Sequence, residues 1–145
     1  MVLSAFETYM SLLASHRIYN NFIVGAQFKP LIKPNKIANV VSRLCRKYPQ
    51  FSLTVGRGHH QEYLPPYDVK NCIDVIDNSN PNKILEKYTA LKFSYSDKVP
   101  LWKLVLDSKS NTLFFVADHT YFDGTAVKKV YHEILNHLMN LKMIN

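Results

Sequence analysis

The sequence predicts an α/β protein: a two-layer arrangement of one mixed β-sheet with helices. Three observations support this. Long amphipathic helical stripes begin at Pro34 and just after Gly124. Several short runs rich in strand-forming residues lie between them. The length of 145 residues, with 47% apolar and 20% charged side chains, fits one globular domain with a single core.

The first third of the chain predicts a helix, a strand and a second helix. Ser4 and Glu7 have the spacing of a capping box, which predicts a helix over residues 4–15. The stretch NNFIVGAQF, residues 20–28, is rich in β-formers and predicts a strand. Pro34 suits the first position of a helix whose apolar stripe continues until Pro49 stops it.

The middle of the chain predicts short strands and a third helix. FSLTV, residues 51–55, and CIDVID, residues 72–77, are predicted strands, and EYLPPYDV between them is a proline-limited edge segment. Asn80 and Pro81 are typical of a helix cap and first position, so a helix is predicted to about Leu91.

The last third predicts a hairpin followed by a helix. PLWKLVL, residues 100–106, and TLFFVAD, residues 112–118, flank the polar turn DSKSN. The second arm is apolar on both faces, which places it in the middle of the sheet. The helix that follows has a long apolar stripe, formed by Val127, Val130, Tyr131, Ile134, Leu135, Leu138 and Leu141.

Composition excludes some classes of function and leaves others open. The net charge of +7 fits a nucleic-acid surface, an anionic membrane surface or an acidic ligand. Solvated helix faces explain it better, because no nucleic-acid motif organises the basic residues. No apolar run approaches the ~20 residues of a membrane-spanning helix. Cys45 and Cys72 lack a CxxC partner, which indicates reduced thiols in the cytoplasm. Peripheral attachment to the endoplasmic reticulum or lipid droplets stays open.

The heptapeptide DHTYFDG, residues 118–124, is the strongest candidate site. His119 stands at the end of a predicted central strand, where loop residues reach the mouth of a crevice. An imidazole can take a proton from a bound hydroxyl or amine near neutral pH and return it to a leaving group. The alternative is a turn histidine hydrogen-bonded to the backbone. His59 and His60 lack a third ligand at metal-binding spacing, so no metal site is expected.

His119, Asp123 and Gly124 form a His-x-x-x-Asp-Gly pattern. It resembles that of the coenzyme A-dependent acyltransferases built like chloramphenicol acetyltransferase, in particular the fungal alcohol acetyltransferase branch. The order of hairpin, motif and long helix is similar to theirs, and so are the stretches FETYM, HRIYNNFIVGAQF and YPQFSLTV. The resemblance implies that residues 1–145 form a single half-domain of that fold, with the C-terminal domain absent.

The resemblance also implies roles for individual residues. His119 would be the general base, acetyl-CoA the donor substrate, and an alcohol, sterol or amine the acceptor, with no tightly bound cofactor. Asp123 would be structural and would form a salt bridge, for which Arg17 is the candidate partner. From the residues alone, Asp123 could equally cap the following helix, and Gly124 leaves room for backbone or ligand.

Two departures from the family pattern qualify these expectations. Asp118 precedes the histidine, and its charge would favour a protonated imidazole if it pointed inward, but not if it pointed outward. The second half of the relatives' cavity has no counterpart, so activity is expected only with a partner domain or in a homo-oligomer. The alternative function is a non-catalytic remnant that serves as a ligand- or protein-binding module.

Overall fold

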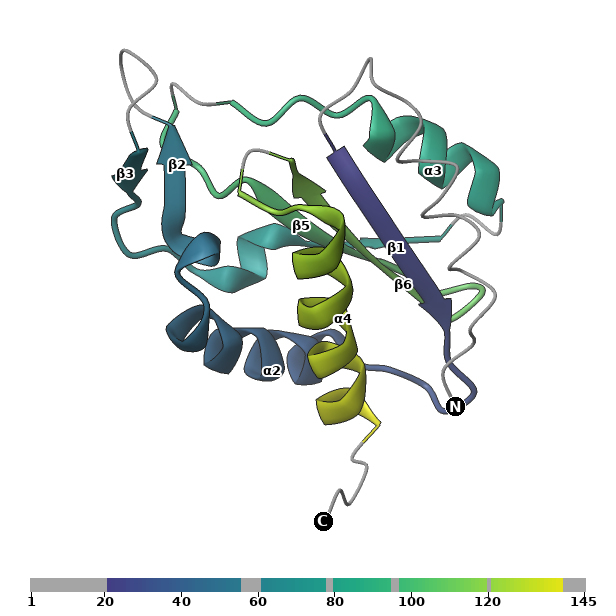
Figure 1. Ribbon diagram of the computed structural model, residues 1–145. Coiled ribbons are helices and arrows are strands. Elements are labelled where there is room, and N and C mark those ends of the chain that lie inside the picture. Colours follow the sequence, from purple (N-terminus) through teal and green to yellow (C-terminus); the bar gives the residue numbers. More distant parts are fainter. Residues whose placement is uncertain (1–20, 56–60, 78–79, 95–96, 120, 140–145) are drawn as a thin grey trace.

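A computed structural model describes residues 21–55, 61–77, 80–94, 97–119 and 121–139 (Figure 1). The predicted helix over residues 4–15 and Arg17 lie outside the described residues. The elements are β1 (Asn21–Gln27), α2 (Pro34–Lys47), β2 (Leu53–Val55), β3 (Gln61–Tyr63), β4 (Ile73–Ile76), α3 (Pro81–Thr89), β5 (Trp102–Asp107), β6 (Thr112–Asp118) and α4 (Gly124–Leu138). Short 3-10 helices cover Pro49–Ser52 and Val69–Cys72.

The main sheet has the strand order β1-β6-β5-β4. β6 pairs antiparallel with β1 and with β5, whereas β4 pairs parallel with β5. The sheet is therefore mixed, and the α/β class predicted from the sequence is confirmed. β6 has a neighbour on each side, as its two apolar faces predicted.

Apolar side chains pack on both faces of this sheet. On one face, α2 and α4 lie together and bury the larger cluster (Figure 1). On the other face, α3 buries a smaller one formed by Ile23, Ile84, Tyr88, Val105, Phe114 and Val116. β6 contributes alternate side chains to each cluster, because successive side chains of a strand point to opposite faces. The helical stripe predicted after Gly124 is buried from Val127 to Leu138.

Local signals set most of the helix boundaries. Pro34 and Pro81 stand at the starts of α2 and α3, and the Asn80 side chain accepts a hydrogen bond from the Asn82 N–H. α3 ends at Thr89 rather than near Leu91, and the Leu91 N–H closes a turn onto the Tyr88 carbonyl.

The strand predicted over residues 51–55 is shorter than expected. Pro49 starts a 3-10 helix that takes in Phe51, so β2 begins only at Leu53. β2 and β3 pair with each other in a separate two-stranded sheet. This small sheet stands beside the main one, near the loop that leads into α4 (Figure 1).

Candidate active site

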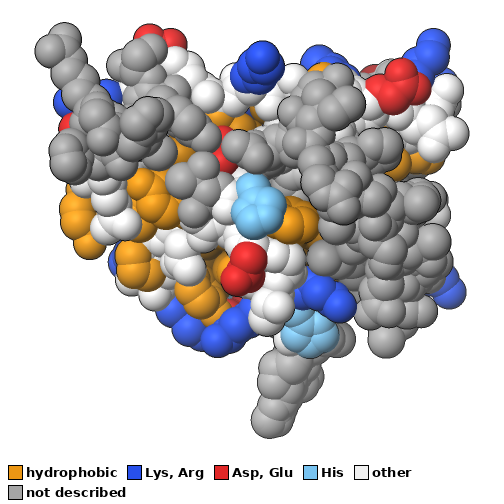
Figure 2. Space-filling view, turned by 45° about the horizontal axis from the view of Figure 1, so that its top comes forward, with side chains coloured by type: hydrophobic (Ala, Val, Ile, Leu, Met, Phe, Trp, Pro, Cys, Tyr) orange, Lys and Arg blue, Asp and Glu red, His pale blue; other side chains and the backbone are white. Residues whose placement is uncertain are grey.

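His119 directly follows the last residue of β6, and its side chain is exposed. The N–H of Asp118 donates to the Leu101 carbonyl at 2.9 Å, so the backbone before His119 is tied to the start of β5. The histidine therefore follows a strand that is paired on both sides. Histidine side chains reach the surface in the space-filling view (Figure 2).

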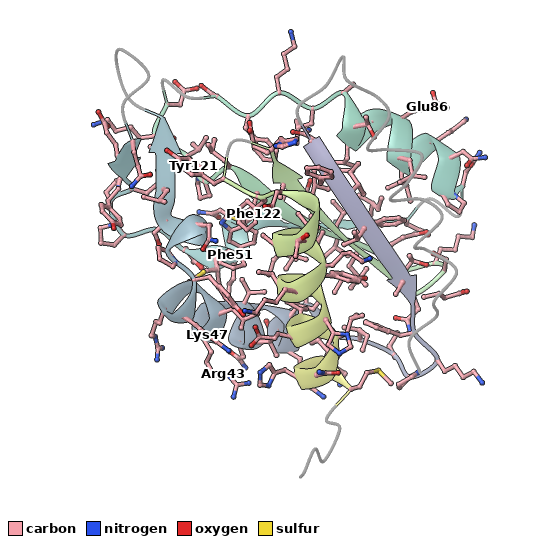
Figure 3. All side chains as sticks on the ribbon, in the orientation of Figure 1. Arg43, Lys47, Phe51, Glu86, Tyr121 and Phe122 are labelled. Atoms are coloured by element: carbon pink, nitrogen blue, oxygen red, sulfur yellow. The ribbon has the colours of Figure 1, made fainter. Side chains whose placement is uncertain are left out.

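Two aromatic residues anchor the segment between His119 and α4. Phe122 is fully buried and makes edge contacts with Phe51 and Phe115, at centroid distances of 5.7 and 5.6 Å. The Tyr121 hydroxyl donates to the Thr54 carbonyl in β2 at 2.7 Å. Tyr121, Phe122 and Phe51 gather between α4 and β2 in Figure 3. This loop is therefore pinned to both sheets.

Asp123 and Gly124 begin the helix. An Asp123 carboxylate oxygen accepts a hydrogen bond from the Ala126 N–H at 2.7 Å. Asp123 therefore caps the helix, which is one of the two roles that the sequence allowed for it. Arg17, its predicted ion-pair partner, lies outside the described residues. A Cβ at position 124 would come no nearer than 3.8 Å to the Phe22 ring, an ordinary contact. The described fold thus tolerates a side chain there.

The Asp118 carboxylate points inward, because the residue is only 4% exposed. Strand alternation places it on the sheet face of Phe114 and Val116, the face that α3 covers. Burial raises the pKa of Tyr121, and the charges of Asp118 and Glu62 raise it further. The Tyr121 hydroxyl therefore stays protonated and remains a donor to Thr54.

The His119 ring lies against Phe22 of β1, with ring centroids 4.6 Å apart and planes tilted by 43°. Nothing in the sequence alone singled out Phe22. The signal that would have found it is the pairing of β1 with β6, which sets Phe22 opposite Ala117. The tie from Tyr121 to β2 was missed for the same reason, since it joins residues 67 positions apart.

Beneath the site, aromatic and thiol groups form a hydrogen-bonded layer. Trp102 is fully buried, and its indole N–H donates to the Phe51 carbonyl at 3.1 Å and to the Tyr67 hydroxyl at 3.2 Å. Burial raises the pKa of the Cys45 thiol and raises that of Cys72 to about 12. Both thiols are therefore protonated near neutral pH and are poor nucleophiles.

In the ranges that the structure describes, no three His, Cys, Asp or Glu side chains cluster to hold a metal ion. His59 and His60 lie outside those ranges. No helix among the described elements has the length and hydropathy to span a bilayer. Basic side chains gather at the surface over α2 (Figure 2), where Figure 3 labels Arg43 and Lys47.

Comparison with known proteins gives consistent relatives. The sequence profile of the alcohol acetyltransferase family matches residues 71–145, just over half of the chain. The N-acetyltransferase SLI1 of Saccharomyces cerevisiae is 22% identical over 148 residues, which cover 94% of this chain and 31% of the yeast protein.

Solved structures share the fold at low sequence identity. The tallysomycin biosynthesis protein TlmII superposes with a TM-score of 0.67 at 14% identity, over 83% of this chain and 32% of its own. The starter condensation domain of rhizomide synthetase RzmA gives 0.63 at 11% identity, over 92% and 37%.

The chain thus spans about a third of the length of these relatives. The likeness to the solved structures shows that the chain shares part of the condensation-domain type of fold. Together with the profile match over the hairpin, the histidine loop and α4, it assigns the chain to a family: this protein belongs to the alcohol acetyltransferase family.

Proposed function

We propose that this chain carries the general base of an acetyl-CoA-dependent acyltransferase, and that His119 is that base. The observation that carries the proposal is an exposed imidazole at the end of a central strand, in a loop fixed by Tyr121 and Phe122. Family membership supports transfer of an acyl group.

The proposed reaction needs one proton acceptor that later becomes a donor. A neutral His119 ring nitrogen takes the proton of the acceptor hydroxyl or amine. At the same time the oxygen or nitrogen of the acceptor attacks the thioester carbonyl of the donor. The tetrahedral intermediate then collapses, the carbon–sulfur bond breaks, and the leaving thiolate takes the proton back from the imidazolium. The products are an ester or amide and coenzyme A.

Neighbouring residues have supporting roles in this proposal. Asp123 keeps α4 starting at a fixed place by capping it and, if the predicted ion pair forms, by pairing with Arg17. The described fold does not itself require a glycine at position 124. In this proposal the role of Gly124 is to leave the space beside the helix start free for substrate.

The other wall of the substrate cavity comes, in this proposal, from a second domain. The chain spans about a third of its relatives, so a complementary part of similar architecture would orient the acetyl-CoA and exclude water. The acceptor is an alcohol, as the family description suggests, or an amine, as the name of the yeast N-acetyltransferase suggests.

A complementation assay tests this function. The chain is co-expressed with the C-terminal part of the yeast N-acetyltransferase, and acceptor-dependent release of coenzyme A is followed with panels of alcohols and amines. Mass spectrometry identifies the acetylated product. Release that disappears in His119→Ala supports the proposal. Binding of coenzyme A that His119→Ala leaves unchanged, without transfer in any pairing, supports the binding-module alternative instead.

A further inference from the structure

A general base works only when its ring nitrogen faces the proton it removes, so something must fix the imidazole. In many enzymes a hydrogen bond to the second ring nitrogen does this. Within the part of the chain that the structure describes, no hydrogen bond or ion pair holds the His119 side chain, which is exposed. A restraint of another kind is needed to hold one orientation.

The pairing of β1 with β6 supplies an aromatic contact at this place. Phe22 stands opposite Ala117 of β6, and His119 lies two residues C-terminal to Ala117, diagonally across from Phe22. Diagonal neighbours of this kind are within reach of aromatic side chains. Because Ala117 has only a methyl group, the Phe22 ring has room to lean toward position 119, where the two centroids are 4.6 Å apart.

Phe22 is itself held on several sides. It belongs to the edge strand β1, and its half-buried ring packs against the larger apolar cluster beneath α2 and α4. Its Cε1 atom lies 3.8 Å from the point that a Cβ of Gly124 would occupy, so the ring also borders the start of α4. A ring fixed in this way limits the rotamers open to the imidazole beside it.

We propose that Phe22 is a positioning residue for His119: its ring keeps the imidazole in one orientation beside the start of α4. The separation of the two ring centroids falls within the range of roughly 4.5–7 Å that aromatic pairs prefer. The catalytic meaning of this contact rests on the proposed role of His119 as the base, whereas the contact and the restraint do not.

Side-chain NMR on the full chain measures the restraint directly. The His119 ring signals are assigned by their loss in His119→Gln, and χ1 is obtained from three-bond couplings. In the unmodified protein one rotamer dominates, and the ring signals are shifted upfield by the Phe22 ring. In Phe22→Leu we expect loss of the upfield shift and averaging of χ1. Phe22→Tyr, which keeps a ring, restores both.

The matched control is Phe93→Leu. Phe93 is also half-buried, but it packs against the smaller cluster on the α3 face. Phe93→Leu should lower the stability of the fold about as much as Phe22→Leu does, but it should leave the His119 signals unchanged. If Phe22→Leu does not fold, Phe22→Met, which keeps more of the volume, gives the same readout.

Two results overturn the proposal: an averaged His119 side chain in the unmodified protein, or a single rotamer that persists without the ring at position 22. Neither depends on enzymatic activity. Transfer that continues in His119→Ala would instead overturn the proposed function and leave the restraint by Phe22 intact, so the two failures are distinguishable.

Discussion

At the scale of single residues, Asp123 links the histidine loop to α4. Its carboxylate accepts a hydrogen bond from the Ala126 N–H and lies at the positive end of the helix dipole. The same carboxylate is the predicted partner of Arg17. The cap needs only an oxygen acceptor, whereas the ion pair needs a negative charge. The two roles can therefore be separated by substitution.

Asp123→Ala should lower the free energy of unfolding by about 1 kcal/mol, because it removes the cap. Asp123→Asn keeps an acceptor oxygen, so if the cap alone matters it should lower the free energy of unfolding by only a few tenths of a kcal/mol. Urea unfolding of both variants measures the difference. A large loss in Asp123→Asn that vanishes in an Arg17→Ala background would instead establish the predicted ion pair; equal stability of all variants would contradict both roles.

At the scale of elements, the Phe114 ring of β6 lies over Gly25 of β1 and leaves no room for a side chain at that position. A Cβ at Gly25 would come within 2.5 Å of Cδ1 of Phe114, its partner in the strand register. Phe114 is buried beneath α3 and has little space to move aside. The pairing that supports the histidine strand therefore depends on this close contact.

We predict that Gly25→Ala lowers the free energy of unfolding by about 1–3 kcal/mol through overpacking. Gly124→Ala is the matched control, because its Cβ makes only ordinary contacts. It should leave thermal stability unchanged while reducing transfer in the complementation assay, if substrate passes that position. Equal losses of stability in the two variants would show that a Cβ at position 25 does not overpack against the Phe114 ring.

The elements themselves were predictable, because their signals are local. Pro34, Asn80 and Pro81 mark helix starts through backbone constraints and capping. The two apolar faces of residues 112–118 predicted the central strand. The 3-10 turn that delays β2 to Leu53 was missed, because strand-forming residues at 51–55 outweighed the effect of Pro49.

Contacts between distant segments were not predictable. His119 could be singled out from residue type, spacing and its place after an apolar strand. Its contact with Phe22 and the hydrogen bond from Tyr121 to Thr54 depend on strand register and on where the small sheet packs. No local pattern in a single sequence determines those placements. The sequence therefore predicts the candidate base but not the residues that contact it and hold its loop.

At the scale of the whole molecule, burial of ionisable groups makes the fold sensitive to alkaline pH. Burial raises the pKa of Cys72 from 9.0 to about 12, although the nearby Lys103 charge opposes the shift. Burial also raises the pKa values of Cys45, Tyr67, Tyr88 and Tyr131. Between the unfolded and folded pKa values, the unfolded chain releases protons that the folded chain keeps.

We therefore expect stability to be unaffected by these groups below about pH 8 and to fall as the pH rises above it. Each group that ionises only on unfolding adds a slope of about 1.4 kcal/mol per pH unit. Cys72→Ala should make the decline between pH 9 and 12 shallower by about one such group. Urea unfolding curves followed by circular dichroism across this range test it. An unchanged slope in Cys72→Ala would contradict the burial of that thiol.

The loss of turnover on replacing His119 tests the central claim most directly. In the complementation assay, with donor and acceptor both saturating, kcat is compared between the unmodified chain, His119→Gln and His137→Gln. His137 is exposed in the last turn of α4, far along the helix from the candidate base. Loss of a general base predicts a fall of about 10²- to 10⁴-fold in His119→Gln, with His137→Gln unchanged. An unchanged kcat in His119→Gln would contradict the assignment of this imidazole as the base.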